Sequence, residues 1–330
     1  DMPKVLTLHR FYIVRAVILL ALAGTNYSYL LSQTVDIDSG EIRLCSYAGK
    51  NNKVLSNFAI TNSNKTETDK PLAELFFYPQ FRFKNSRLDR IYLLQLNVNP
   101  TLHLSLWKGA AVTAQVIFPI YNDYSSDESK IRPGFLTLSQ ILELPAGIKM
   151  MATAGNFNMQ RAGGDLKLYR EVGSRAGVYA QAGITYWSVP FFDRWTTSQN
   201  NRFNWRFGAN YMMESSRILL NANVSQYLEN DIALRGEIIR YFKNATVGFY
   251  VQTLQHEGYF LNGGFFFTIS LPPRKRSNSK NFIIAPSQDF SLDYVARPYP
   301  TRGVYYRTSP AENSSHNFFN NFLLNKKTKY

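Results

Sequence analysis

The chain has 330 residues, a formal net charge of +14, and 15% aromatic but only 18% charged residues. Its mean hydropathy of -0.24 excludes a bundle of membrane-spanning helices, and its single cysteine, Cys45, excludes an intramolecular disulfide and a thiol metal cluster. The positive charge favours anionic partners. Because the basic residues are scattered and match no nucleic-acid-binding motif, nucleic acid is not predicted as a partner.

The first predicted element is a signal peptide with a short leader, at residues 1–33. Lys4, Arg10 and Arg15 accompany an apolar run at 16–24 that is too short to cross a bilayer as a helix. A permanent amino-terminal anchor is the alternative. The pattern favours export, and residues 34–72 are expected to form a periplasmic segment or the first strands.

The next region, residues 73–271, has a pattern with a period of two. In the stretch 203–211, apolar and aromatic residues alternate with Asn204, Arg206, Gly208 and Asn210. Alternate side chains of a strand point to opposite faces, so one face suits lipid and the other suits water. Short links between such stretches have hairpin spacing and indicate an antiparallel meander.

The predicted fold class is therefore all-β, an antiparallel up-and-down transmembrane β-barrel of about twelve strands in the outer membrane, with a C-terminal non-barrel tail. A soluble β-sandwich or lipocalin-like barrel is the alternative, but its exposed faces would carry more Lys and Glu. The predicted strands lie at residues 75–83, 91–106, 110–120, 135–142, 148–157, 164–170, 177–187, 203–211, 218–225, 232–238, 246–252 and 264–271.

The tail at residues 272–330 begins where the composition changes. Pro272 and Pro273 end the last predicted strand, and the residues that follow are rich in Asn, Ser and Pro. Scattered apolar residues predict that part of the tail folds back, as a lumen plug or along the periplasmic rim. The end, from Asn320, is expected to be disordered.

Several short motifs occur in a recognisable succession. They are Ile131-Arg132-Pro133-Gly134, Gly163-Gly164-Asp165, Tyr169-Arg170, Gly173-Ser174-Arg175, Gly263-Gly264 and Arg297-Pro298. In this order the chain resembles the YjbH-like outer-membrane family associated with exopolysaccharide production, over residues 76–303. It departs from the family at Glu171-Val172 and in length, which makes it similar to a shortened, single-barrel relative. The resemblance implies a non-enzymatic barrel that assists export or assembly of a surface exopolysaccharide.

Inward-facing polar side chains are the candidate binding residues. Cations outnumber anions among them, so we expect a basic interior that holds an anionic polysaccharide by weak contacts. The alternative is that these charges pair across neighbouring strands to fill a narrow lumen. Outer-membrane lipid and secretion-complex proteins are the other expected partners. The candidates are Lys149, Asp165, Lys167, Arg206, Asn210, Arg235 and Glu237.

Catalytic chemistry is not predicted. The four histidines are too dispersed for a metal site, and no cofactor is expected. His103 and Ser105 share one strand face, as the base and nucleophile of a barrel hydrolase acting on lipid or polymer would, but plain alternation also produces this arrangement. A passive porin is a further alternative.

Overall fold

The computed structural model describes residues 73–84, 93–255, 258–271, 282–287, 289–296, 302–310 and 318–320. The predictions for the signal peptide, for residues 34–72 and for Cys45 lie outside these ranges. The chain divides into two compact units, Asp1–Arg43 and Leu44–Tyr330, and every described residue belongs to the second. None of the helices in the described ranges has the length and apolar character needed to span a bilayer.

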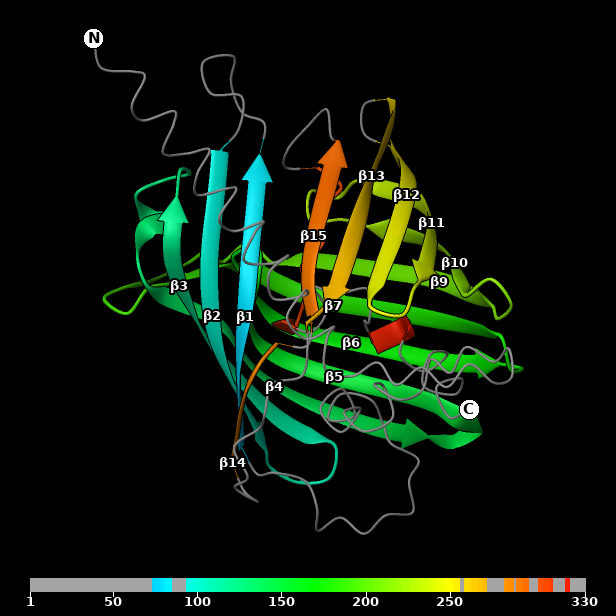
Figure 1. Cartoon of the computed structure of the whole chain (residues 1–330), viewed down its shortest axis with the longest axis horizontal. Coiled ribbons are helices and arrows are strands. Elements are labelled where there is room, and N and C mark those ends of the chain that lie inside the picture. The colour runs from blue at the N-terminus through cyan, green and yellow to red at the C-terminus, as the bar shows by residue number, and fades with distance from the viewer. Residues whose placement is uncertain are drawn as a thin grey trace, which may run out of the picture. The chain divides into compact units, whose positions relative to one another are not determined.

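One sheet of fifteen strands makes up the described part of the chain (Figure 1). The strands are β1 (Ala73–Lys84), β2 (Leu93–Ser105), β3 (Ala110–Asn122), β4 (Arg132–Leu144), β5 (Ile148–Phe157), β6 (Arg161–Val172), β7 (Ala176–Pro190), β8 (Trp195–Thr197), β9 (Arg202–Met213), β10 (Ile218–Gln226), β11 (Ile232–Tyr241), β12 (Ala245–Gln255), β13 (Tyr259–Ser270), β14 (Phe282–Pro286) and β15 (Asp289–Ala296).

The strands from β1 to β13 form an antiparallel meander, in which β8 pairs only with β7 and β9 lies next to β7. At one end, turns of three or four residues join β2 to β3, β4 to β5, β6 to β7, β9 to β10 and β11 to β12. We call this the short-turn end. The opposite, long-loop end carries the longer connections at residues 123–131 and 191–201. In bacterial membrane barrels the short turns face the periplasm.

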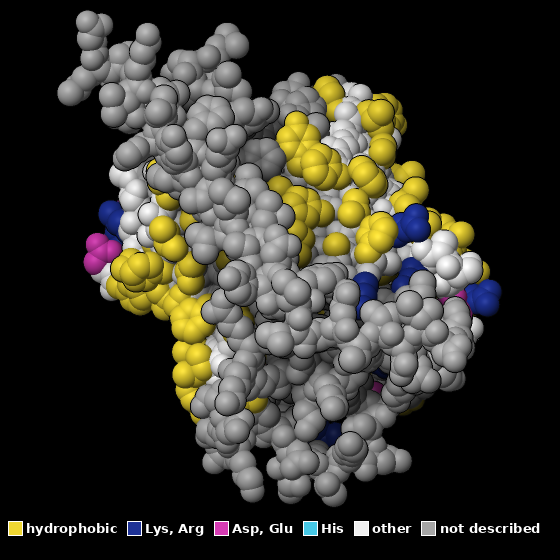
Figure 2. Space-filling model, in the orientation of Figure 1, with side chains coloured by type: hydrophobic (Ala, Val, Ile, Leu, Met, Phe, Trp, Pro, Cys, Tyr) yellow, Lys and Arg dark blue, Asp and Glu magenta, His cyan; other side chains and the backbone are white. Residues whose placement is uncertain are grey.

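The two faces of the sheet differ in the way that the alternation predicts. Phe207 and Leu234 are each 58% exposed on the outer face, whereas Asn204 and Ser225, on the inner face, are fully buried. Figure 2 shows apolar side chains gathered on the outer surface over β12 and β13. A soluble sandwich would bury its apolar face, so this alternative is wrong. The arrangement is that of a wall between lipid and a polar interior.

A pair of glycines lets neighbouring strands of this wall approach closely. Gly155 and Gly163 lie opposite each other on β5 and β6, with φ of 140° and 153°. A Cβ at Gly163 would collide with the backbone carbonyl of Ile184 on β7, and one at Gly155 would collide with that of Leu136 on β4. Only glycine fits both the positive φ and the close contact with the neighbouring backbone, so these two positions fix the spacing of β4 to β7.

Each of the twelve predicted segments coincides with a strand, but the structure adds β8, β14 and β15. The expectation that residues 272–330 lie wholly outside the sheet is therefore wrong for β14 and β15. The alternation of Phe290, Leu292 and Tyr294 with polar residues was a usable signal. The Pro-rich composition around this stretch masked it.

The chain segment that holds β14 and β15 meets both ends of the sheet. Its first part, β14, pairs in parallel with β1, and its second part, β15, pairs antiparallel with β13. The strands β1 and β15 lie side by side (Figure 1). The hydrogen-bonded order nevertheless runs from β14 to β15 without closing into a ring.

We expect that replacing outward-facing Leu234 by arginine destabilises the wall by about 2–4 kcal/mol, because a charge there would lie in hydrocarbon. The matched substitution Phe242→Arg lies in the turn between β11 and β12 and should cost at most about 1 kcal/mol. Urea unfolding in phospholipid vesicles measures both. Equal costs at the two positions would contradict a lipid-facing β11.

Candidate functional site

The end of the chain lies against the inner face of the sheet. We call residues 302–310 and 318–320 the C-terminal segment. At the long-loop end, the backbone N–H of Gly303 donates to Asp231 Oδ2 at 2.6 Å, and the N–H of Arg307 donates to Asn158 Oδ1 at 2.6 Å. Asp231 and Asn158 belong to the β10–β11 and β5–β6 connections. The segment is thus fastened to two loops by short hydrogen bonds.

Further along, the C-terminal segment completes a buried ion pair of β6. Lys167 Nζ lies 3.8 Å from Asp165 Oδ1, and the two side chains are at most 2% exposed. Tyr306 donates its hydroxyl to Asp165 Oδ2 at 2.7 Å, and Lys167 donates to Thr308 Oγ1 at 2.7 Å. A buried ion pair is stable only when its remaining polar groups find partners. Here the C-terminal segment supplies one partner to each charge.

The protonation of Tyr306 follows from the same environment. Burial, and then the negative charge of Asp165, raise the pKa of the Tyr306 phenol above its usual range. The hydroxyl therefore stays protonated and remains a hydrogen-bond donor to the carboxylate.

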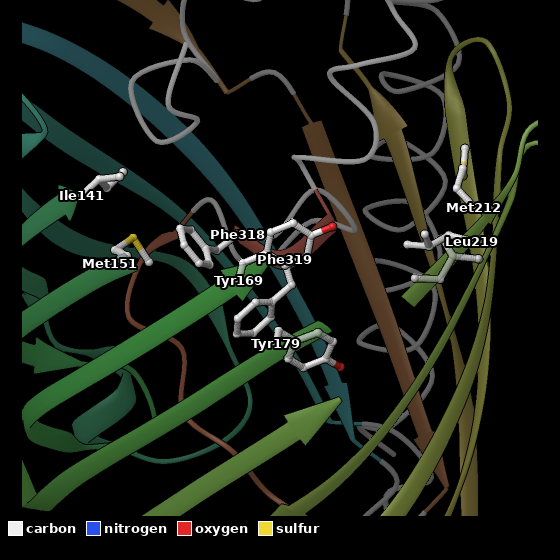
Figure 3. Close-up of a cluster of buried hydrophobic side chains, with 9 residues drawn as sticks. Ile141, Met151, Tyr169, Tyr179, Met212, Leu219, Phe318 and Phe319 are labelled. Carbon is white, nitrogen blue, oxygen red and sulfur yellow. The ribbon is translucent and has the colours of Figure 1, made fainter. Parts of the chain in front are cut away.

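At the short-turn end, two phenylalanines of the C-terminal segment, Phe318 and Phe319, belong to a cluster of buried apolar side chains on the inner face (Figure 3). We call it the apolar cluster. The ring of Phe319 stacks on Tyr179 at 4.2 Å between centroids, and Asn210 Nδ2 donates to the Phe319 carbonyl at 3.1 Å. Apolar side chains are unexpected on the inner face, and here they form one buried cluster with Phe318 and Phe319. The wall contributes Ile141, Met151, Tyr169, Tyr179, Met212, Leu219 and Ile239.

The inner face of β9 to β12 carries a second polar network. Arg235 Nε donates to Glu237 Oε1 at 2.6 Å, and its guanidinium lies 3.6 Å from the centre of the Tyr250 ring. Asn221 Nδ2 donates to Glu237 Oε2 at 2.8 Å. The carboxylate of Glu237 thus has a partner at each oxygen, which suits a buried anion.

Arg206 is placed differently. Its Nε donates to Ser225 Oγ at 3.1 Å, and its guanidinium lies 4.2 Å from the centre of the Tyr305 ring. Among the described residues it forms no ion pair.

The structure places all seven predicted binding residues on the inner face. Lys149 pairs across strands with Glu171 at 3.1 Å, whereas Lys167 and Arg235 each pair with a carboxylate of their own strand, Asp165 and Glu237. Asn210 holds the C-terminal segment instead. Binding of a ligand by these residues stays a prediction.

Sequence patterns missed other inner-face residues. Tyr306 and Thr308 approach Asp165 and Lys167 from 141 residues away, and no local pattern predicts such a contact. Arg161 was also missed, although its place on the polar face of β6 follows from the alternation that identified Asp165.

His103 makes a hydrogen bond other than the predicted one. The Nδ1 of His103 hydrogen-bonds Thr113 Oγ1 at 3.0 Å, rather than Ser105, and its ring packs beside Phe76 at 5.6 Å. Among the residues that the structure describes, no three His, Cys, Asp or Glu side chains lie close enough to hold a metal ion.

Comparison with known proteins adds little to this geometry. No family model and no curated protein matches the chain. Among solved structures it is similar to OmpT, an outer membrane protein of Vibrio cholerae. The in-vitro folded protein aligns at 10% identity and a TM-score of 0.33, over 72% of this chain and 100% of that one. A mutant of it lacking loop L8 aligns at 10% identity and a TM-score of 0.33, over 60% and 88%.

Similarity at this level carries no argument by itself. The class of the protein follows instead from its own coordinates, which show an all-β, mostly antiparallel sheet with an apolar outer face and a polar inner face. This is the fold type of outer-membrane β-barrels.

The contact between Tyr306 and the wall can be tested at Gly183. A Cβ at this position would collide with the Tyr306 hydroxyl, so Gly183→Ala should break the hydrogen bond to Asp165. We expect faster amide hydrogen exchange in residues 302–310. The control is Gly164→Ala on the adjacent strand, where a Cβ meets nothing within 4 Å. Equal protection in the two variants would show that this contact does not hold the segment.

Proposed function

We propose that this chain is an outer-membrane β-barrel protein that assists the export or assembly of a surface exopolysaccharide and catalyses no reaction itself. One observation carries the proposal. The C-terminal segment occupies the inner face through polar contacts at the long-loop end, at Asp165 and Lys167, and through Phe319 at the short-turn end. An occupant held by many separate contacts can be displaced stepwise, as passage of a polymer requires.

The outer and inner faces support the same function. The apolar outer face suits outer-membrane lipid as the surrounding solvent. The inner face offers amides, hydroxyls and guanidinium groups, which bind sugar hydroxyls and acidic groups through weak, exchangeable contacts. An anionic polysaccharide is the proposed passenger, and proteins of a secretion complex are the proposed partners.

Two alternatives are less well supported. A passive porin needs an unobstructed lumen, whereas here the C-terminal segment is buried against the wall. A hydrolase needs a nucleophile within hydrogen-bond reach of a base, and the Nδ1 of His103 is engaged by Thr113 instead.

Deletion of residues 302–330 tests the proposal, because it removes the C-terminal segment and leaves every strand in place. In planar bilayers we expect the full chain to conduct little and the deletion variant to conduct steadily. In cells that make the polymer, loss of the chain should lower the amount of polysaccharide at the surface, and the intact chain should restore it.

Heat-modifiable migration of the chain from outer-membrane fractions is the control for correct assembly. Unchanged surface polysaccharide in cells that lack the chain would overturn the proposed function. A full chain that conducts as well as the deletion variant would support the porin alternative.

A further inference from the structure

The inner face holds two kinds of cation. Lys149, Lys167 and Arg235 each lie within 4 Å of a carboxylate. Three arginines, Arg161, Arg202 and Arg206, have no carboxylate partner among the described residues. These three belong to β6 and β9, the two strands that flank β7. The excess positive charge of the inner face is therefore gathered on one sector of the wall.

Two of these arginines flank the same threonine. Arg161 is 8% exposed and donates from Nε to Thr185 Oγ1 at 3.2 Å and from Nη2 to the Thr185 carbonyl at 3.3 Å. Thr185 lies directly opposite Arg202 in the ladder between β7 and β9. Arg202 is a like charge for Arg161 and Glu229 of the β10–β11 connection is an opposite one, but no carboxylate lies within 4 Å of Arg161 among the described residues. An anionic ligand would give both guanidinium groups a direct partner.

The third arginine extends the sector along β9. Arg206 follows Arg202 by four residues on the same face, which separates their Cα atoms by roughly 13 Å. One carboxylate cannot bridge that distance. The ring of Tyr305 lies over Arg206 and stacks at 4.9 Å on Tyr306. Tyr305 therefore holds the Arg206 guanidinium in place through a cation–π contact.

We propose that Arg161, Arg202 and Arg206 form a binding site for an acidic carbohydrate chain, with the guanidinium groups taking successive carboxylate or sulfate groups. The inference rests on the proposed function and assigns the residues that would hold its anionic passenger. A neutral polysaccharide would leave the three charges uncompensated.

Binding to the full chain in detergent micelles tests the site by calorimetry. The probes are oligogalacturonate, which is acidic, and a maltooligosaccharide of the same length, which is neutral. We expect oligogalacturonate to bind at least about tenfold more tightly, and its affinity to fall as salt rises. The variants Arg161→Gln and Arg206→Gln should each weaken that binding about fivefold or more, whereas Arg206→Lys should keep most of it.

Arg240→Gln is the matched control, because Arg240 is exposed on the outer face beside Phe242. Equal affinity for the neutral probe, or equal loss in the Arg240 variant, would overturn the site. Failure of the proposed function is distinguishable: oligogalacturonate would still bind through Arg161 and Arg206, while cells lacking the chain would keep their surface polysaccharide.

A second inference concerns the ends of the sheet and rests on register alone. The parallel pairing of β14 with β1 places Phe77 opposite Pro286. Continued without a shift, the same register places Phe81 opposite Phe290 and Arg82 opposite Ser291. Phe81 shares the outer face with its β2 partner Leu96, and Phe290 shares it with Ile269 of β13. The continued register therefore places two outward-facing side chains, Phe81 and Phe290, opposite each other.

We infer that β1 and β15 pair in this continued register in the membrane and close the wall with one parallel junction. Fourteen strands follow one another by hydrogen bonding, from β14 to β15. When β14 and β15 lie one after the other in a single strand position between β1 and β13, these strands form a ring of thirteen positions. A bilayer favours closure because backbone groups facing hydrocarbon need partners. Phe77 accepts from the N–H of Ser287, so the backbone of Pro79, two residues on, faces the same junction and lacks the N–H that a ladder uses; this junction is therefore weaker than the others.

Cross-linking tests the register. In a chain with Cys45→Ser, the pair Phe81→Cys and Phe290→Cys should react efficiently in outer membranes with a thiol cross-linker of about 5 Å span. The pair Phe81→Cys and Leu292→Cys keeps both thiols on the outer face but lies on a diagonal of roughly 8 Å, so it should react less. Equal or reversed yields would overturn the register, and absence of both cross-links in correctly assembled chain would overturn closure.

Discussion

Alternation of side chains between hydrocarbon and a polar interior is the constraint on which the structure depends. It fixes register, since a slip of one residue would turn Phe207 inward and Arg206 outward. It also creates a problem inside the wall, because each inward polar group needs a partner in a space with little water. Neighbouring strands satisfy part of this need, as Asn221 of β10 does for Glu237 of β11. The C-terminal segment satisfies much of the rest.

The C-terminal segment and the wall therefore depend on each other for hydrogen-bond partners and apolar contacts. The hydroxyls of Tyr306 and Thr308 complete the Asp165–Lys167 pair, which alone would be a poorly compensated charge pair in the interior. Likewise, the apolar cluster at the short-turn end would lose two of its buried members without Phe318 and Phe319, and apolar side chains would be left on a polar face. A wall built only as an open channel would need neither feature.

The sequence predicted the strands and their faces because that information is local. A period of two over 203–211 is enough to place Arg206 and Asn210 on the inner face. Partners are not local. Whether Lys167 meets a carboxylate or a ligand depends on strand register and on Thr308, which is 141 residues away. The strands β14 and β15 escaped prediction because proline and polar residues surround their short alternating runs.

Charge compensation separates the structural charges of the inner face from the functional ones. Where a cation has a carboxylate, as Arg235 has Glu237 at 2.6 Å, replacing either member leaves the other buried and alone, and the effect falls on stability. Where a cation has none within 4 Å, as Arg161 has none among the described residues, its removal leaves no buried carboxylate unpaired and costs only the hydrogen bonds to Thr185. Loss of the Arg161 charge should therefore affect the fold less than loss of the Arg235 charge while weakening the binding of an anion, which makes the two roles separable in one protein.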